Sequence, residues 1–425
     1  MLDRYGVIND FSQDRWDENI TIGMKLFDLA VLWYYCFGGS VVLRPMVSVF
    51  WSAMAILGLF VFRMRFIQIN KYKQLVLAMI AMITLSTFYS VDSEATLKYS
   101  LSILLYFVIA IEITTRKRNV KFFLNSLCGY SLVLLAVSFV ERFTPALYTS
   151  TIMSFLPATY HFSIQTFMRN GSVNGFFNQT SSNAVAMSLG ACVFFYKMMR
   201  ENESAVKKTV YFIGMIAFVY GIVLTVRRAS LLAIILILMI FLYSSYGNTF
   251  TKLLVILAAF GVIFWGGVST IPVLSNIVSK TALNAAAGDI SDGRFTIWMS
   301  CFQLFNERPI LGYGADSLQS AFSQVNNAHN SFIQSLVELG VIGAIVFYVP
   351  FIYSFVTSIK TYSRRREFTF DDQALVSVAL FWQIYSFINA MFEALFAGET
   401  AVFMMFIMQM IVMQVLKNRN MAVGR

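Results

Sequence analysis

Long, uninterrupted apolar blocks constrain this chain more than any other feature. They recur along its 425 residues and reach about 20 residues, the length that a helix needs to cross a bilayer. Because lipid offers the backbone no hydrogen-bond partner, only helices and closed barrels span it, and barrels need alternating apolar positions. The chain is 58% hydrophobic and only 13% charged, whereas soluble domains are about a quarter charged. These features predict an all-α, polytopic membrane protein.

We predict about twelve transmembrane helices in a single integral membrane domain that covers residues 1–425. The predicted spans are 26–43, 46–62, 74–90, 97–114, 122–140, 180–198, 209–226, 229–245, 253–270, 330–358, 374–393 and 400–416. The segment 1–25 is polar and of mixed charge, which is untypical of a cleaved signal peptide. We therefore expect a cytoplasmic tail at 1–25 and a second one at 417–425.

The basic residues predict the orientation of these spans. With the N-terminus in the cytoplasm, most of the 32 Lys and Arg residues fall in inside segments, as the positive-inside rule requires. An even number of spans then places both termini inside. The same sorting accounts for the net charge of +10 without a nucleic-acid partner. The outside receives only Arg44, Lys98, Arg142, Arg169, Arg227, Arg228, Lys280, Arg294 and Arg308.

Two of the outer connections are long, at residues 141–179 and 271–328. Long loops in compact proteins are usually functional or disordered. In the main loop, 271–328, apolar residues recur at helical spacing between Phe295 and Phe305, which predicts a short helix lying on the outer surface. Functional residues are therefore expected in these two loops and at the span ends beside them.

Three arginines stand where spans meet the outer loops. Arg227 and Arg228 form a tight link between two spans, and Arg294 precedes the predicted loop helix. Arginine offers a planar donor fork that grips phosphate through two hydrogen bonds and does not lose its proton. Two adjacent arginines outside also run against the positive-inside rule, which favours a functional role. The alternative is that these side chains reach out to lipid headgroups.

His329, one of two histidines in the chain, stands at the outer mouth of the span 330–358 and is followed by Asn330. An imidazole at this position can act as a general base near neutral pH. The alternative is that His329 caps or anchors the start of the span. The other histidine, His161, is expected to be an ordinary loop residue.

Three further residues inside the same span are expected to support the structure. Glu338 is a carboxylate within an apolar span, and such groups usually face the bundle interior and have a partner. Gly340 and Gly343 have the small-residue spacing that lets helices approach closely. The four cysteines are scattered, and the outer positions lack a cluster of acidic or histidine residues, so neither a metal site nor a cofactor is predicted.

The order of these motifs resembles the bacterial O-antigen ligase and O-antigen polymerase family. The pieces that carry the resemblance are Thr225-Val226-Arg227-Arg228-Ala229, Gly293-Arg294, Trp298, Pro309, Gly312-Tyr313-Gly314, His329-Asn330, Gly340 and Gly343, with a weaker piece at Asn174-Gly175-Phe176-Phe177-Asn178. Arg228 falls on the arginine of the family motif, and Arg227 stands where the family commonly has serine. Which of the two arginines is functional therefore stays open. The motifs cover a small part of the chain.

The resemblance implies a metal-independent inverting glycosyltransferase of the C-type superfamily in the bacterial inner membrane. Its donor is a glycan on undecaprenyl pyrophosphate, and its active site faces the periplasm, where both long loops lie. Arginines at the positions of Arg228 and Arg294 hold the pyrophosphate, and the histidine at the position of His329 acts on the acceptor. The polymerase extends the glycan with lipid-linked repeat units, and the ligase transfers it to lipid A-core.

We favour the polymerase, because the main outer loop is modest in length and the chain is very apolar and rich in phenylalanine. The ligase is the first alternative. A transporter or flippase for lipid-linked sugars is the second, but transporters usually place ionisable residues and broken spans at mid-membrane in repeated halves. Here the candidate residues gather at one face. The sugar and its linkage are left open, and so is whether a chain-length regulator binds. Membrane lipids are the other expected partners.

Overall fold

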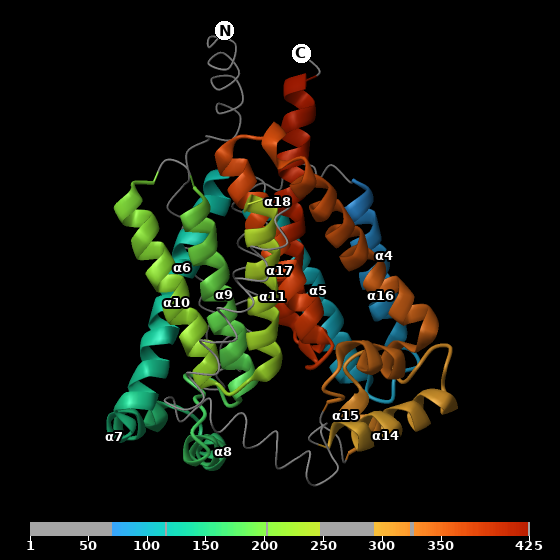
Figure 1. The fold of residues 1–425 in the computed structure, drawn as a ribbon. Helices are drawn as coiled ribbons and strands as arrows, with labels where there is room; N and C mark the ends of the chain where they lie inside the picture. The colour runs from blue at the N-terminus through green and yellow to red at the C-terminus, as the bar shows by residue number, and fades with distance from the viewer. Residues whose placement is uncertain (1–69, 115–116, 201–202, 247–292, 324–326, 424–425) are drawn as a thin grey trace.

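The computed structural model describes residues 70–114, 117–200, 203–246, 293–323 and 327–423. The regular structure within these ranges is helical and forms an upright bundle with short helices at one end (Figure 1). The bundle consists of α4 (Lys71–Ser86), α5 (Ser93–Thr114), α6 (Lys117–Phe143), α9 (Thr180–Met199), α10 (Ala205–Leu224), α11 (Arg228–Tyr246), α16 (Ser331–Ser363), α17 (Phe370–Ala390) and α18 (Glu399–Val423). The short elements are α7 (Pro145–Leu147), η2 (Tyr148–Ile152), η3 (Met153–Phe155), α8 (Ala158–Arg169), α14 (Arg294–Glu307), α15 (Leu318–Ala321), η4 (Arg365–Glu367) and η5 (Leu395–Ala397).

Each predicted span that lies within the described ranges coincides with one of the bundle helices. Of these helices α5, α6, α10, α16, α17 and α18 are long and apolar enough to cross a membrane, so the all-α membrane fold is confirmed. The count of twelve spans is not confirmed. The spans predicted at 26–43, 46–62 and 253–270 lie outside the described residues, as do the tail 1–25 and residues 271–292 of the main loop.

The other three bundle helices are α4, α9 and α11, and the described apolar part of α11, Arg228–Phe241, is shorter than a full span. The reasons are physical for α4 and α9. α4 has 16 residues and is therefore about 24 Å long, shorter than the roughly 30 Å hydrocarbon core of a bilayer. α9 is long enough but buries polar residues, and Asn183 donates from Nδ2 to Ser138 Oγ of α6 at 3.1 Å. Because α9 is buried along most of its length, its side chains face protein rather than lipid.

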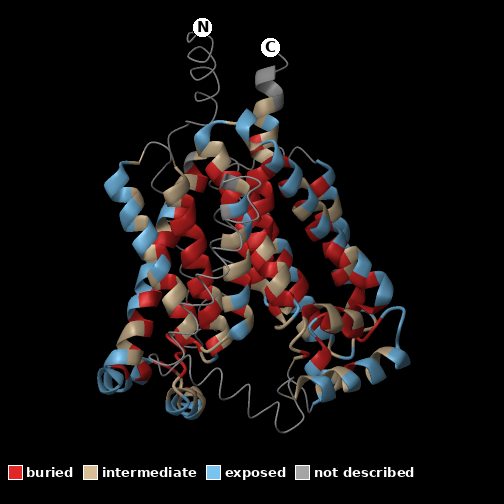
Figure 2. Cartoon of the chain, in the orientation of Figure 1, coloured by how far each residue is buried: buried red, intermediate tan, exposed pale blue. Residues whose placement is uncertain are grey.

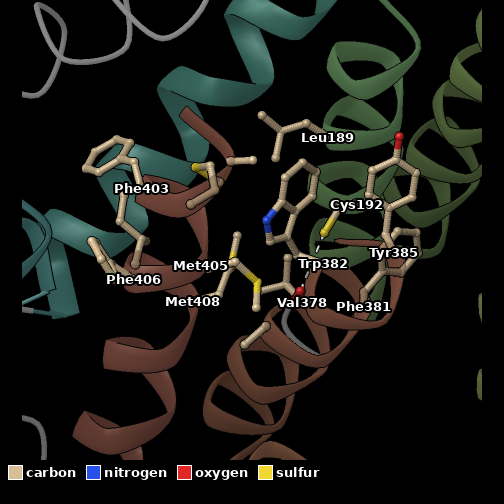
Figure 3. Close-up of a cluster of buried hydrophobic side chains, with 14 of the residues drawn as sticks. Leu189, Cys192, Val378, Phe381, Trp382, Tyr385, Phe403, Met405, Phe406 and Met408 are labelled. Carbon is tan, nitrogen blue, oxygen red and sulfur yellow. Dashed lines mark hydrogen bonds between the residues drawn. The ribbon is translucent and has the colours of Figure 1, made fainter. Parts of the chain in front are cut away.

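Aromatic and sulfur-containing side chains fill the centre of the bundle (Figure 3). Trp382 of α17 is fully buried, and Figure 3 shows it beside Leu189 and Cys192 of α9 and Met405 of α18. Figure 2 shows that the peripheral helices α10 and α16 turn exposed residues outward while the central ones are buried. A close-packed centre of this kind fixes where the helix ends lie.

The two ends of the bundle differ in charge. Ion pairs join α6 and α17 at one end, where Lys117 lies 2.6 Å from Asp372 and Lys121 lies 2.6 Å from Asp371. We call this the basic end, because it gathers Lys71, Lys73, Lys117, Lys121, Lys197, Arg200, Lys207, Lys208, Lys360, Arg364, Arg365, Arg366, Lys417 and Arg419. The opposite loop end carries α7, α8, α14 and α15 (Figure 1). The described basic residues predicted to be inside and outside therefore lie at opposite ends of the bundle.

The loop end contains the short helix that the sequence predicts between Phe295 and Phe305. It is α14, which lies across the loop end in Figure 1. Its inner face packs Cys301 against Tyr313, Leu318 and Val337. Its outer face exposes Phe295, Met299 and Phe302.

Candidate active site

Arg227 is positioned by the strained link between α10 and α11. The preceding Val226 has a φ of 57°, an uncommon and costly conformation for a β-branched residue. After this turn Arg227 is half-buried, and its Nε donates to Thr180 Oγ1 at 2.7 Å. Thr180 is the first residue of α9. The link therefore holds Arg227 against the start of a neighbouring helix.

Arg294 is the first residue of α14 and ties this surface helix to the bundle. Its Nη1 donates to the backbone oxygen of Phe392 at 2.6 Å. Phe392 lies in the connection from α17 to α18, residues 391–398. The first residue of the loop helix thus reaches a segment that is distant in sequence.

His329 lies one residue before the N-cap of α16 and also has an unusual backbone, with a φ of 47°. Its backbone N–H donates to Asn327 Oδ1 at 2.9 Å. Trp298 of α14 donates from Nε1 to the backbone oxygen of Ala328 at 2.9 Å, so it holds the residue next to the histidine. This bond gives Trp298 a positioning role that its place in the sequence does not reveal.

The side chain of Glu393 brings these residues together. Its Oε1 accepts from Arg227 Nη1 at 3.1 Å and from Arg294 Nη2 at 3.4 Å. Its Oε2 lies 3.4 Å from His329 Nδ1. We call these four residues the Glu393 cluster. It joins the α10–α11 link, α14, the start of α16 and the α17–α18 connection at the loop end.

The charge of Glu393 is set by its surroundings. Burial alone would raise the pKa of this carboxyl, whose side chain is only 15% exposed. The His329 contact and the positive charges of Arg227 and Arg294 outweigh burial and hold the pKa of Glu393 below its ordinary value. Glu393 is therefore a carboxylate at neutral pH. Because a carboxylate only accepts hydrogen bonds, its contact with His329 is a hydrogen bond when Nδ1 carries the proton.

Asn330 and Ser331 fix the backbone around Glu393. Asn330 caps α16, since its Oδ1 accepts from the N–H groups of Phe332 and Ile333, and its Nδ2 donates to Met391 O at 3.0 Å. Ser331 donates to the backbone oxygen of Glu393 at 3.0 Å and accepts from Phe396 N at 3.0 Å. Asn330 and Ser331 thus hold the α17–α18 connection, which carries Glu393, the partner of His329.

Gly340 interrupts α16, and the segment that packs closely against it is a loop rather than a helix. It has a φ of 64° and a ψ of −176°, and an added Cβ would overlap the backbone oxygen of Ile310. The segment 309–314 lies along this break, where Gly314 N donates to Glu338 O at 2.7 Å. A Cβ on Gly312 would come within 2.5 Å of the same carbonyl. The main loop and α16 therefore meet backbone to backbone.

Gly343 lies further along α16, beside α4. Its added Cβ would lie 3.0 Å from Met82 Cε, so it faces α4 and allows that helix to approach. Of the two glycines expected to support helix packing, Gly343 therefore packs against a helix and Gly340 against a loop.

Glu338 is buried and has several partners, as a supporting residue should. It accepts from Gln334 Nε2 at 2.9 Å and from the backbone N–H of Asp316 at 3.2 Å and of Leu318 at 3.4 Å. Gln334 in turn accepts from Ala328 N at 3.3 Å. Glu338 therefore fixes the turn after Gly314 and reaches the segment before His329 through Gln334.

The structure separates the two adjacent arginines. Arg227 contacts Glu393, while Arg228 is the exposed first residue of α11. The weaker motif at 174–178 lies nearby, since Val173 N donates to Leu224 O at the end of α10 at 3.1 Å. Its Asn174 and Gly175 amides bind the carboxylate of Glu141, which fixes this loop on α6.

Sequence reasoning missed Glu393 because it was assigned to the end of the span predicted at 374–393. The structure ends α17 at Ala390, so Glu393 lies in the connection instead. One signal was available, because an acidic residue at the end of an apolar span, on the same side as three arginines, suggests a partner. Among the described residues no three His, Cys, Asp or Glu side chains are grouped so that they could hold a metal ion.

Residues 213–348 match the model of a protein family described as O-antigen ligase. The matched stretch contains Arg227, Arg228, Arg294 and His329, whereas Glu393 lies beyond it. The match confirms the resemblance that the motifs suggested. None of the curated proteins compared with the chain matches it.

Proposed function

We propose, on the premise that residues 213–348 place the chain in the O-antigen ligase and polymerase family, that it transfers a glycan from undecaprenyl pyrophosphate to an acceptor hydroxyl at the loop end. The family supports a ligase- or polymerase-type role in O-antigen biosynthesis. The observation that carries the proposal is the convergence of Arg227, Arg294 and His329 on Glu393. Two phosphate-binding groups and a base beside one another suit this transfer.

The arginines would act on the leaving group. When the sugar carbon leaves the pyrophosphate oxygen, the departing lipid pyrophosphate takes the electron pair and gains negative charge. Fixed guanidinium groups stabilise that charge more in the transition state than in the bound donor, which accelerates the step. Arg227 and Arg294 are held for this purpose by Thr180 and Phe392. Arg228, exposed beside them, is the third candidate for pyrophosphate binding.

His329 would act on the acceptor. With the Nδ1 proton directed at Glu393, the other ring nitrogen, Nε2, has the lone pair that can take a proton. The acceptor hydroxyl gives its proton to Nε2 as its oxygen bonds to the sugar carbon and the bond to the pyrophosphate breaks. A single displacement of this kind inverts the anomeric centre, and it needs no metal when the guanidinium groups supply the positive charge.

The distribution of charge supports placement in the bacterial inner membrane with the loop end in the periplasm. The basic end fits the cytoplasmic side under the positive-inside rule, and the described C-terminal helix α18 ends there. The Glu393 cluster would then face the leaflet that holds the lipid-linked donor.

The acceptor distinguishes two forms of the proposal. A polymerase uses a second lipid-linked repeat unit, which the modest main loop and the apolar, phenylalanine-rich composition favour. A ligase uses lipid A-core, which the description of the matched family as O-antigen ligase favours. Both share the donor chemistry assigned to the Glu393 cluster.

The test is transfer by the purified full chain, with chelator present, from undecaprenyl-pyrophosphate-linked repeat units extracted from the source cells. A ladder of longer lipid-linked products would establish the polymerase, and transfer only after addition of lipid A-core would establish the ligase. His329→Ala should abolish either product. His161→Ala is the matched control, because His161 bonds to Leu156 O within its own loop at 2.9 Å. Movement of the donor across a bilayer without a new glycosidic bond would instead identify a transporter.

A further inference from the structure

We infer that Glu393 is an exchangeable counter-ion whose two oxygens have separate tasks: Oε1 occupies the place of a donor phosphate oxygen between the arginines, and Oε2 orients His329. This inference rests on the proposed function. The donor would displace Oε1 from the guanidinium groups and leave the histidine contact in place. Glu393 is then a positioning residue for the transfer, since it acts through three other side chains.

The contact distances support an exchange at Oε1. Each arginine has a short bond to a neutral acceptor, 2.7 Å from Arg227 to Thr180 and 2.6 Å from Arg294 to Phe392 O. Their contacts with Glu393 are longer, at 3.1 and 3.4 Å. Charge-assisted hydrogen bonds are usually about 2.7–2.9 Å, so these are loose ones. The arginines can therefore keep their positions when the carboxylate oxygen leaves.

The backbone of Glu393 supports a change confined to the side chain. Ser331 holds its carbonyl oxygen at 3.0 Å, and Arg294 holds the preceding carbonyl of Phe392. Rotation of the side chain can thus free Oε1 without moving the connection. The side chains of Glu393 and Arg227 are 15% and 27% exposed, so an incoming ligand can reach this ion pair.

The positive charges of Arg227 and Arg294 explain why a carboxylate is useful between them before the donor binds. Two guanidinium groups held together repel each other unless an anion lies between them. Glu393 supplies that anion before the donor arrives and keeps the arginines gathered. A pyrophosphate carries more negative charge than one carboxylate and forms hydrogen bonds with the same donors, so it can replace Oε1.

Removing the charge of Glu393 should therefore strengthen pyrophosphate binding and slow turnover. In Glu393→Gln no carboxylate competes for the arginines, so the pyrophosphate should bind more tightly. The amide can turn its NH₂ group toward His329 Nδ1, which would place the imidazole proton on Nε2 and remove the base. A residue that only supports the structure would instead weaken binding and turnover together.

The experiment uses the full chain in lipid nanodiscs. Binding of undecaprenyl pyrophosphate, which needs no sugar, is measured beside single-turnover transfer from extracted lipid-linked repeat units. For Glu393→Gln we expect undecaprenyl pyrophosphate to bind about threefold tighter or more, on the scale of a partly exposed ion pair. We expect transfer to be about 100-fold slower or more, as for the loss of an oriented base. Glu94→Gln is the matched control, an exposed carboxylate at the loop end whose partner is Lys98.

The outcomes separate this inference from the proposed function. Weaker binding of undecaprenyl pyrophosphate by Glu393→Gln, with an unchanged Tm, would overturn the exchange, and unchanged turnover would overturn the orienting task. If the glutamine variant does not fold, Glu393→Asp decides, because its shorter side chain cannot serve both the arginines and His329. Wild-type binding and turnover in Glu393→Asp would then reject the inference. A wild-type protein that neither binds undecaprenyl pyrophosphate nor transfers glycan would reject the proposed function itself.

Discussion

Arg227 and Arg294, which lie far apart in the sequence, donate to one and the same oxygen, Oε1 of Glu393. The shared acceptor brings the α10–α11 link and the first residue of α14 together at the α17–α18 connection. A ligand that binds one guanidinium group therefore meets the other.

This geometry predicts that Arg227→Ala and Arg294→Ala each slow transfer, by about 100-fold, because each removes a fixed positive charge from the leaving group. Lysine should restore little of the rate, since it lacks the planar fork. The measurement is single-turnover transfer to the acceptor that the wild type uses, because the polymerase and the ligase share the same donor chemistry. Arg228→Ala is the internal comparison: a larger loss there than in Arg227→Ala would make the exposed arginine the main pyrophosphate ligand.

The backbone contact at Gly340 predicts a large stability effect. Gly340→Ala should destabilise the protein by about 2 kcal/mol or more, because the new Cβ overlaps a backbone oxygen and the φ is positive. Gly129→Ala in α6 is the control, since a Cβ there has open space, and it should be neutral or stabilising by up to about 1 kcal/mol. Thermal unfolding in detergent gives both values. Equal Tm values for the two variants would contradict the close approach of the main loop to α16.

The bond from Trp298 to Ala328 predicts an effect on activity that exceeds the effect on stability. Trp298→Phe keeps an aromatic ring beside Phe295 but loses the Nε1 donor. The Tm should fall by only a few degrees, as for one hydrogen bond of about 1 kcal/mol. Transfer should slow more than donor binding weakens, because the released segment carries His329. Unchanged turnover would show that α14 does not position the histidine.

The lowered pKa of Glu393 predicts how stability depends on pH. A carboxylate with a depressed folded-state pKa contributes stability that is present above its ordinary value of 4.5 and is lost as the pH falls through the lower folded value. Between pH 7 and 3 the Tm of the wild type should therefore fall more than that of Glu393→Gln. Thermal scans of both proteins in one buffer series test this, and parallel curves would mean that the ion pairs add no stability.

The sequence predicts the helices of the described bundle well, because solid apolar blocks report spans directly. It also predicts site roles for Arg227, Arg228, Arg294 and His329, since few polar residues stand at the outer span ends. The structure brings three of these, Arg227, Arg294 and His329, together on Glu393. Glu393 falls within the span predicted at 374–393, because the apolar composition continues past Ala390, where α17 ends. Which of Arg227 and Arg228 turns inward depends on the φ of Val226, and residue order alone does not encode that value. At Gly340 the sequence predicts a helix contact where the structure has a break, because small-residue spacing occurs in both.

Four of the residues that form or anchor the Glu393 cluster stand at helix starts. Thr180 and Arg294 are the first residues of α9 and α14, Arg227 immediately precedes α11, and His329 lies two residues before the first residue of α16. Every helix carries a partial positive charge at its N-terminus, the end of its macrodipole. These four helix starts thus place partial positive charge from peptide groups beside the cluster, and side-chain substitution does not remove it. Anionic lipid should consequently retain some affinity for this end of the protein even when both arginines of the cluster are replaced.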